Sequence, residues 1–223
     1  MRLTQEYQKN ILFYLEKVNN IQITERFKAL QQWQAQRLLN THLSLYEQPR
    51  FQPAMNFFKD ELYSAECFHG RNRQLIRATP LMCNTMPESM LDIVLQAAEL
   101  HSLSLSLDRE LLSNLPEHVD VRNLDLDSWV LAYQKCGNQD DRIQQINLIE
   151  SLGNGLASLV KKPLIHSLLK WARFPAIMAG YEEIHHFVVA GFDAFEHLEN
   201  ADDFLIPVIT TERTLSHQWF SKN

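Results

Sequence analysis

The sequence predicts an all-α fold, a bundle of about nine or ten helices. Apolar residues recur at helical spacing along much of the chain. Glycine and proline are few, six and eight of 223 residues, and most of them fall where a periodic segment would begin or end. No segment offers a convincing strand together with a second strand to pair with it. An all-helical chain with short connections is therefore expected.

The first helices are located by their start signals. Thr24 precedes a helix that reaches about residue 47, and Pro53 lies near the start of a helix running to Tyr63. The four residues from Thr85 to Glu88 have the spacing of a capping box, which predicts a helix from there to about residue 115. This third helix is the longest predicted so far.

The later helices have equally clear boundaries. Gly137 is the expected C-terminal cap of a helix over 127–136, and Asn138, followed by two acids, begins the next one. Lys161 and Lys162 stand before Pro163, where cations favour a helix end. No internal repeat, low-complexity tract or linker interrupts the chain, so a single domain over residues 1–223 is expected.

One passage has a strand-like pattern. LHSLSLSL, residues 100–107, alternates apolar and polar residues, as a half-buried strand does. A helical stripe nevertheless runs across it, formed by Ile93, Ala97, Leu100, Leu107 and Leu111. The helix is the favoured interpretation.

Composition narrows the class of protein. Hydrophobic residues make up 45% and charged residues 22%, as in a globular protein. A net charge of -6 gives no general attraction to nucleic acid or to an anionic membrane, although a local basic patch stays open. The three cysteines are far apart and include no CxxC pair, so a reducing cytoplasm is expected rather than a disulfide framework. The N-terminal residues lack the pattern of a signal peptide.

EEIHHF, residues 182–187, is the first candidate metal site, because it repeats the Glu-x-x-His spacing of di-iron bundles. Turning about 100° per residue places Glu182 and His186 opposite the apolar arc of this helix. His185 and Glu183 fall at the two edges of that arc. A solvated face is therefore favoured over a metal site or a partner-binding surface. Glu66 and His69, with the same spacing, lie in a predicted helix junction.

Three weaker candidates have ordinary structural explanations. No glycine-rich loop surrounds Arg71, Arg73 and Arg77, so a solvated or salt-bridged helix is favoured over a phosphate site. Cys83 has no nucleophile signature and is expected to be buried. A set of aromatic residues is expected to form core, with an apolar pocket as the alternative. The set is Trp129, Tyr133, Trp171, Phe174, Phe187, Phe192 and Phe195.

A line of polar residues faces inward on the predicted helix 85–115. His101, Ser104 and Asp108 fall inside its apolar arc, and Glu212 has a similar inward direction on the last helix. Buried polar groups must be satisfied, because an unpaired one costs about 1–3 kcal/mol. Arg73 and Arg77 are expected to offer cations to either acid.

These inward residues allow two interpretations. A structural network fixing helix register is favoured. The alternative is a catalytic site in which His101 is a base or ligand and Asp108 or Glu212 is a metal-binding or orienting acid. Ser104 has no base in evident reach and is not assigned as a nucleophile.

The chain resembles an uncharacterised bacterial family of all-helical proteins. The resemblance rests on residues 50–64 (RFQPAMNFFKDELYS), 97–108 (AAELHSLSLSLD) and 190–205 (AGFDAFEHLENADDFL). The family pattern FF-x-x-x-LY is matched by Phe57, Phe58, Leu62 and Tyr63. Where the family has an Arg-Asp pair, this chain has Arg71 followed by Asn72, which weakens a catalytic role for an acid there. The resemblance implies a single helical domain and no particular activity.

The function expected is therefore one of two. The favoured hypothesis is a cytoplasmic, non-enzymatic helical protein that binds a partner or a small apolar ligand in a cleft between helices, with no cofactor, nucleic acid or membrane involved. The alternative is a metal-dependent oxidase or hydroxylase of the di-iron type, with His101, Asp108 and Glu212 as its ligands. At the level of fold alone, ferritin-like and haem-oxygenase-like bundles are the nearest analogies.

Overall fold

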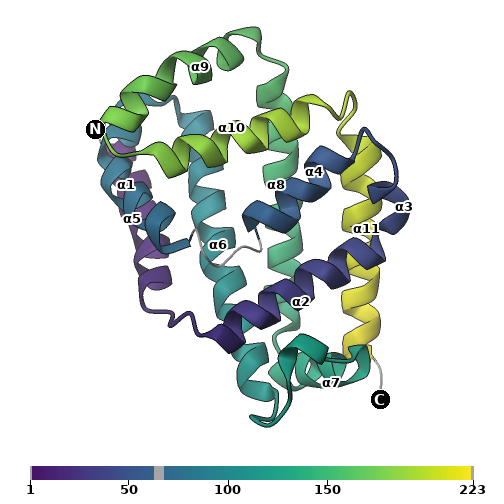
Figure 1. The fold of residues 1–223 in the computed structure, drawn as a ribbon. Coiled ribbons are helices and arrows are strands. Elements are labelled where there is room, and N and C mark those ends of the chain that lie inside the picture. Colours follow the sequence, from purple (N-terminus) through teal and green to yellow (C-terminus); the bar gives the residue numbers. More distant parts are fainter. Residues whose placement is uncertain (1, 63–67, 222–223) are drawn as a thin grey trace.

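The computed structural model describes residues 2–62 and 68–221, and this part of the chain is helical with no strand (Figure 1). The all-α prediction is confirmed. The α-helices are α1 (Arg2–Asn19), α2 (Glu25–Thr41), α3 (Leu43–Tyr46), α4 (Gln52–Phe57), α5 (Phe68–Thr85), α6 (Glu88–Asn114), α7 (Leu126–Cys136), α8 (Gln139–Val160), α9 (Pro163–Met178), α10 (Glu182–Glu196) and α11 (Asp202–Ser221). A π-helical turn, η1 (Phe58–Leu62), and a 3-10 turn, η3 (Val121–Asn123), complete the described structure.

The long helices α6 and α8 run through the middle of the molecule and pack on each other, and α11 packs on α8 at one edge (Figure 1). On one side α1 packs against α5 and α6, and α2 crosses the bundle to contact α6. α10 lies over α4, α5 and α8. α9 is at the outer edge in Figure 1 and rests mainly on α10, with a smaller contact to α8.

Several predicted boundaries are confirmed by their cap geometry. Thr24 caps α2, because its side-chain oxygen accepts a hydrogen bond from the amide of Phe27 at 3.1 Å. Gly137 follows α7 with a φ of 62°, a left-handed conformation that glycine adopts without steric cost. α8 then begins directly after Asn138. α8 ends at Val160, before the two lysines, and Pro163 opens α9.

The capping box at Thr85 was wrong. α5 continues through Pro80 as far as Thr85, whose hydroxyl donates to the carbonyl of Leu81 at 2.8 Å instead of capping the next helix. α6 starts at Glu88, with Pro87 in the cap position. A local hydrogen bond to the preceding turn has thus outcompeted the cap.

The described chain also has more helices than predicted, because two expected helices are divided. The segment predicted from Thr24 to residue 47 ends as α2 at Thr41, and the short α3 follows. The segment from Pro53 changes from α-helix to π-helix at Phe58, and Tyr63 lies outside the described residues. LHSLSLSL, by contrast, lies inside α6 as predicted.

The core is built from separate apolar clusters between these helices. One joins α4, η1, α10 and α11. The ring centroids of Phe58 and Phe204 lie 5.8 Å apart there, and those of Phe57 and Phe187 lie 5.5 Å apart. Another is aromatic and centres on Trp129, which is 1% exposed. The buried Cys83 belongs to the cluster between α1, α5 and α6, as predicted. No helix in residues 2–62 and 68–221 is long and apolar enough to span a bilayer.

Candidate functional site

Asp108 lies on the inward face of α6, as its helical position predicted. Its side chain is buried and accepts hydrogen bonds from two amides of α2. Gln34 donates to Oδ1 at 2.8 Å and Gln31 donates to Oδ2 at 3.1 Å. Burial raises the pKa of Asp108, while Gln34, the charge of Arg142 and Gln31 lower it in part, and burial prevails. Asp108 is thus held as a hydrogen-bond acceptor between helices.

Ser104 is tied into the same region from the side of α8. Gln145 donates to its hydroxyl at 2.8 Å, and Arg142 donates in turn to the amide oxygen of Gln145 at 3.2 Å. The buried guanidinium of Arg142 also lies over the ring of Tyr133, with its central carbon 4.7 Å from the ring centroid. The partners of α6 therefore come from α2 and α8, and they form a network between helices.

His101 occupies a different environment, one turn before Ser104 and towards α5. Burial, together with the charge of Arg71, lowers the pKa of His101 to about 3. The imidazole is therefore neutral at physiological pH. Arg71 is itself buried, with its guanidinium 4.3 Å from the ring centroid of Phe187 on α10.

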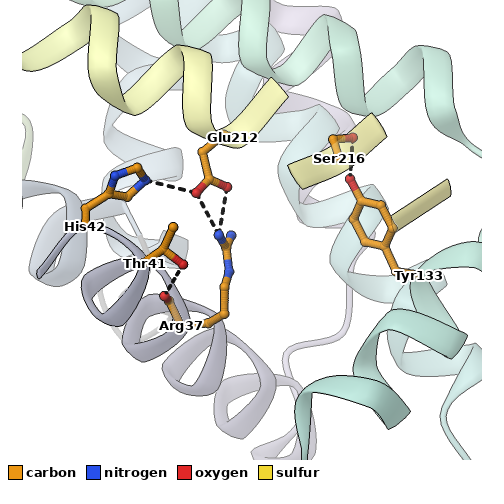
Figure 2. A network of polar contacts seen from close by, with 6 residues as sticks. All are labelled: Arg37, Thr41, His42, Tyr133, Glu212 and Ser216. Carbon is orange, nitrogen blue, oxygen red and sulfur yellow. Dashed lines mark hydrogen bonds and ion pairs between the residues drawn. The ribbon is translucent and has the colours of Figure 1, made fainter. Parts of the chain in front are cut away.

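Glu212 points inward from α11 and binds Arg37 on α2 and His42 at the C-terminal end of α2 (Figure 2). A single terminal nitrogen of Arg37 donates to both carboxylate oxygens, at 2.7 and 2.8 Å. His42 donates from Nε2 to Oε1 at 3.0 Å. Thr41, the residue between them in Figure 2, donates to the backbone carbonyl of Arg37 at 2.9 Å. We call Arg37, His42 and Glu212 the Glu212 triad.

Electrostatics hold the carboxylate of Glu212 in its charged form. Burial raises the pKa of Glu212, but the charge of Arg37 and the hydrogen bonds from His42 and Arg37 outweigh that effect, so the net pKa lies below the ordinary value. Arg37 also lies near the rings of Trp219 and Trp129, at 5.3 and 5.8 Å from their centroids. The carboxylate is thus fully engaged by groups of this chain.

Arg73 and Arg77 do not serve the two acids in the described structure. Both side chains are exposed on α5, and Arg77 donates to the carbonyl of Ala179 at 3.3 Å and lies over the ring of Tyr181. The cations that face Asp108 and Glu212 are Arg142 and Arg37 instead. The sequence could not identify these partners, because they are separated from the acids by dozens of residues in the chain.

The metal-site alternatives find no support in the geometry. Glu182 and His186 are exposed on α10, as the angular argument predicted, and His185 donates from Nε2 to the carbonyl of Leu169 at 2.8 Å. Within the described ranges, no three His, Cys, Asp or Glu side chains converge to hold a metal ion. Glu66 lies outside the described residues, and so does the side chain of its partner His69.

The most unusual surface of the molecule is on α9. Five large apolar side chains of this helix are more than half exposed: Leu164, Leu168, Trp171, Phe174 and Met178. Trp171 is 80% exposed and Phe174 is 70% exposed, and the two together present on the order of 300 Å² of aromatic surface. The largest apolar patch of an ordinary monomer is about 300–600 Å² in total. We call these five residues the α9 face.

The predicted aromatic cluster is divided by this finding. Trp129, Tyr133, Phe192 and Phe195 are buried and Phe187 is partly buried, but Trp171 and Phe174 are exposed. The expectation that all seven form core or line a pocket was wrong for these two. α9 carries apolar residues on both sides, and Ile165, Leu169 and Ala172 form the side that rests on the protein. Nothing local in the sequence identifies which of the two sides is covered.

A cleft lies between α9 and α10. Its volume is about 230 Å³. Apolar side chains and nitrogen-bearing side chains share the lining, with one carboxylate. The lining residues are His166, Leu169, Lys170, Arg173, His185, Val189, Phe192 and Asp193.

The comparisons with known proteins point to a family and to no activity. No curated protein and no solved structure matches the chain. A family model described as "Domain of unknown function (DUF8198)" matches residues 14–223, which confirms the expected membership of an uncharacterised family. The chain therefore belongs to the DUF8198 family.

Proposed function

We propose that this chain is a binding protein and that the α9 face is its partner-binding surface. The observation that supports this most strongly is the exposure of Leu164, Leu168, Trp171, Phe174 and Met178 on one helix. Exposing such a surface to water is unfavourable, at about 25 cal/mol for each Å². A contiguous apolar surface of this kind is typical of an interaction site.

A partner surface is better supported than a small apolar ligand. Two clefts lie beside α10: one against α4, with a volume of about 250 Å³, and the cleft against α9, with about 230 Å³. Sites for drug-sized ligands have about 300–1,000 Å³. The oxidase alternative is not favoured, because His101, Asp108 and Glu212 each have separate surroundings and no metal-binding group forms among the described residues. A cytoplasmic location stays a prediction.

The test is photo-crosslinking in cells that produce the protein. A photoreactive amino acid replaces Trp171 on α9 or, as the matched control, Leu131 on α7. Leu131 is 57% exposed and lies outside the α9 face. We expect discrete adducts, to protein or to lipid, at position 171 and not at position 131. The proposal is refuted if position 171 gives no more adduct than position 131.

A second variant establishes that an adduct reports binding. Leu168→Ser and Phe174→Ser, added to the chain with the photoreactive residue at position 171, should abolish the adduct, because they remove apolar contact area on both sides of the probe. Both residues are exposed, so the fold should tolerate the change. Circular dichroism checks that the helices are retained. An adduct that survives these substitutions would count against the α9 face as the binding surface.

A further inference from the structure

The segment that contains α9 is cationic, whereas the chain as a whole is acidic. No Asp or Glu occurs between Glu150 and Glu182, a stretch that contains the whole of α9. Four of the 21 Lys and Arg residues lie there, so the remaining chain has 17 cations against all 27 acids. The four are Lys161, Lys162, Lys170 and Arg173. An acidic protein therefore presents an acid-free, cationic segment together with its exposed apolar helix.

The cations of α9 lie on the side of the helix away from the apolar stripe. Turning about 100° per residue puts Leu164, Leu168, Trp171 and Met178 within roughly 80° of one another. Lys170 then lies about 120° from the middle of this stripe, and Arg173 lies about 180° from it, so both cations are on the polar side of the helix. The lysine has a long aliphatic stem that can follow an apolar surface while its ammonium group stays in a polar layer. This is the arrangement of a helix lying in a membrane interface, with aromatic and leucine residues on one face and cations on the polar face.

The cleft between α9 and α10 adds a place for an anionic group. Lys170 and Arg173 line it together with His166 and His185. Both lysine and arginine side chains are exposed, and no ion pair of either is found among the described residues. His185 is engaged by the carbonyl of Leu169, and His166 lies 3.3 Å from the carboxylate of Glu196.

Asp193 is the single acid lining this cleft, and it comes from α10, the helix beneath α9. The ammonium and guanidinium groups of α9 are thus the cleft's main means of binding an anion. A phosphate group matches both of them, since arginine binds it through a fork of donors and lysine as a point charge.

A second copy of this chain fits the α9 face less well. In a two-fold dimer through α9, the acid-free helix of one protomer would face the acid-free helix of the other. Such a contact has no acid from α9 to offset its like charges, which disfavours the pairing. A partner with an apolar layer and a negative surface provides both kinds of complementarity. An anionic phospholipid bilayer has this composition.

We propose that α9 docks the protein on the surface of an anionic phospholipid bilayer. The α9 face enters the boundary between headgroups and acyl chains, and Lys170 and Arg173 bind lipid phosphates at the mouth of the α9–α10 cleft. The proposal rests on the proposed function, because it identifies the partner of the same face. It revises the expectation that no membrane is involved, which was drawn from the net charge of the whole chain. The mode is peripheral, since no described helix is able to span a bilayer.

The experiment is co-sedimentation of the full chain with phospholipid vesicles. One set of vesicles is pure phosphatidylcholine, and the other contains added phosphatidylglycerol. We expect the bound fraction to rise with the anionic lipid. Binding should weaken as salt is raised from about 0.1 M to about 1 M, because the screening length falls from about 10 Å to about 3 Å.

Two variants separate the apolar and the charged contributions. Leu168→Ser with Trp171→Ser should abolish binding to both kinds of vesicle, while Leu131→Ser, with equal exposure outside the α9 face, should bind as the unchanged protein does. Lys170→Gln with Arg173→Gln should weaken binding to the anionic vesicles about fivefold for each cation removed. Its binding to neutral vesicles should be unchanged. Circular dichroism of each variant confirms that it is folded.

Three results would overturn the lipid proposal. They differ in whether the proposed function is retained. Absence of vesicle binding, with protein adducts at position 171 in cells, makes the partner an acidic protein and retains the α9 face. Absence of vesicle binding, with a dimer that Leu168→Ser and Trp171→Ser dissociate in analytical ultracentrifugation, makes the partner a second copy. Absence of both vesicle binding and adducts refutes both proposals.

Inorganic phosphate distinguishes a lipid headgroup from a free anion. It is titrated into the full chain and into the Lys170→Gln, Arg173→Gln variant by calorimetry. We expect phosphate alone to bind much more weakly than the anionic vesicles. Tight phosphate binding that is lost in the variant, without any vesicle binding, would assign the cleft to a free phosphate and would contradict the membrane proposal.

Discussion

Glu212 on α11 and Trp171 on α9 depart from the usual distribution of polar and apolar side chains in opposite ways. Glu212 brings a charge inside, and Trp171 leaves a large ring outside. The charge has its partners within the chain, Arg37 and His42. The ring is 80% exposed and has no comparable covering in the described structure. The inward polar groups of this protein thus stabilise its own fold, whereas its exposed apolar helix is suited to binding a partner.

The largest expected effect compares two tryptophans. Trp129→Ala should lower the free energy of unfolding by about 3–5 kcal/mol, because it empties a fully buried site. Trp171→Ala should change it by no more than about 0.5 kcal/mol. Urea denaturation of both variants measures the difference. If Trp171→Ala were as destabilising as Trp129→Ala, α9 would have to be covered by the chain itself.

The second effect concerns the Glu212 triad. Glu212→Ala leaves the mostly buried guanidinium of Arg37 without its counter-charge, and we expect a loss of about 3 kcal/mol in the free energy of unfolding. Replacing both members, with Arg37→Met and Glu212→Leu, should cost less than Glu212→Ala, because no unpaired charge remains. A double-mutant cycle in urea gives the coupling energy. Additive single effects would show that the two side chains contribute independently.

The third prediction uses the pKa of His101, which burial lowers to about 3 from an ordinary value of 6.5. Below about pH 6 the unfolded chain binds a proton that the native imidazole does not. Stability should therefore fall by up to about 1.4 kcal/mol for each pH unit between pH 6 and pH 4 because of this group. His101→Gln should reduce that slope, while His217→Gln, at an exposed position of α11, should leave it unchanged. Denaturant titrations at a series of pH values provide the slopes.

Glu212 titrates in a separate and lower window. Its pKa is depressed, so its ion pair contributes fully above the ordinary glutamate value and is lost as the pH falls through the lower native value. As the pH is lowered, the effect of His101 on stability begins near pH 6, and the effect of Glu212 begins at lower pH. Equal slopes for the His101→Gln variant and the unchanged protein near pH 5 would contradict the neutral state of His101.

The smallest effect concerns Arg213, the neighbour of Glu212 in sequence. Its side chain is 46% exposed and pairs with Glu150 at 2.5 Å on the surface between α11 and α8. Arg213→Ala should lower the free energy of unfolding by at most about 1 kcal/mol, because exposed pairs are solvated and screened by salt. High salt should reduce the effect further. Adjacent residues of one helix would then show the difference between a buried and an exposed ion pair.

The sequence predicted those features that depend on local chemistry. The cap at Thr24, the left-handed Gly137 and the start after Asn138 each involve neighbouring residues, and all three are confirmed. The outward direction of Glu182 and His186 follows from helical geometry alone and is also confirmed. A single domain over residues 1–223 stays a prediction.

Features that depend on tertiary packing could not be predicted in the same way. Gln31 and Gln34 reach Asp108 across more than 70 residues, and no local pattern specifies that pairing. The sequence also could not predict which face of α9 rests on α10, because both faces of this helix are apolar. At Thr85 two local interactions competed, and the hydrogen bond within α5 replaced the predicted cap. An outward apolar face is visible only once the neighbours of the helix are known.

The four tryptophans fall into two groups with different surroundings. Trp33 and Trp219 lie 5.5 and 4.8 Å from Trp129, measured between ring centroids, so these three indoles share one environment. Trp171 stands alone on α9. The fluorescence of the Trp171→Phe variant therefore reports on the aromatic core. The fluorescence difference between the unchanged protein and this variant reports on Trp171 of α9. Unfolding of the core and occupancy of α9 can thus be read as separate emission signals without attaching a dye.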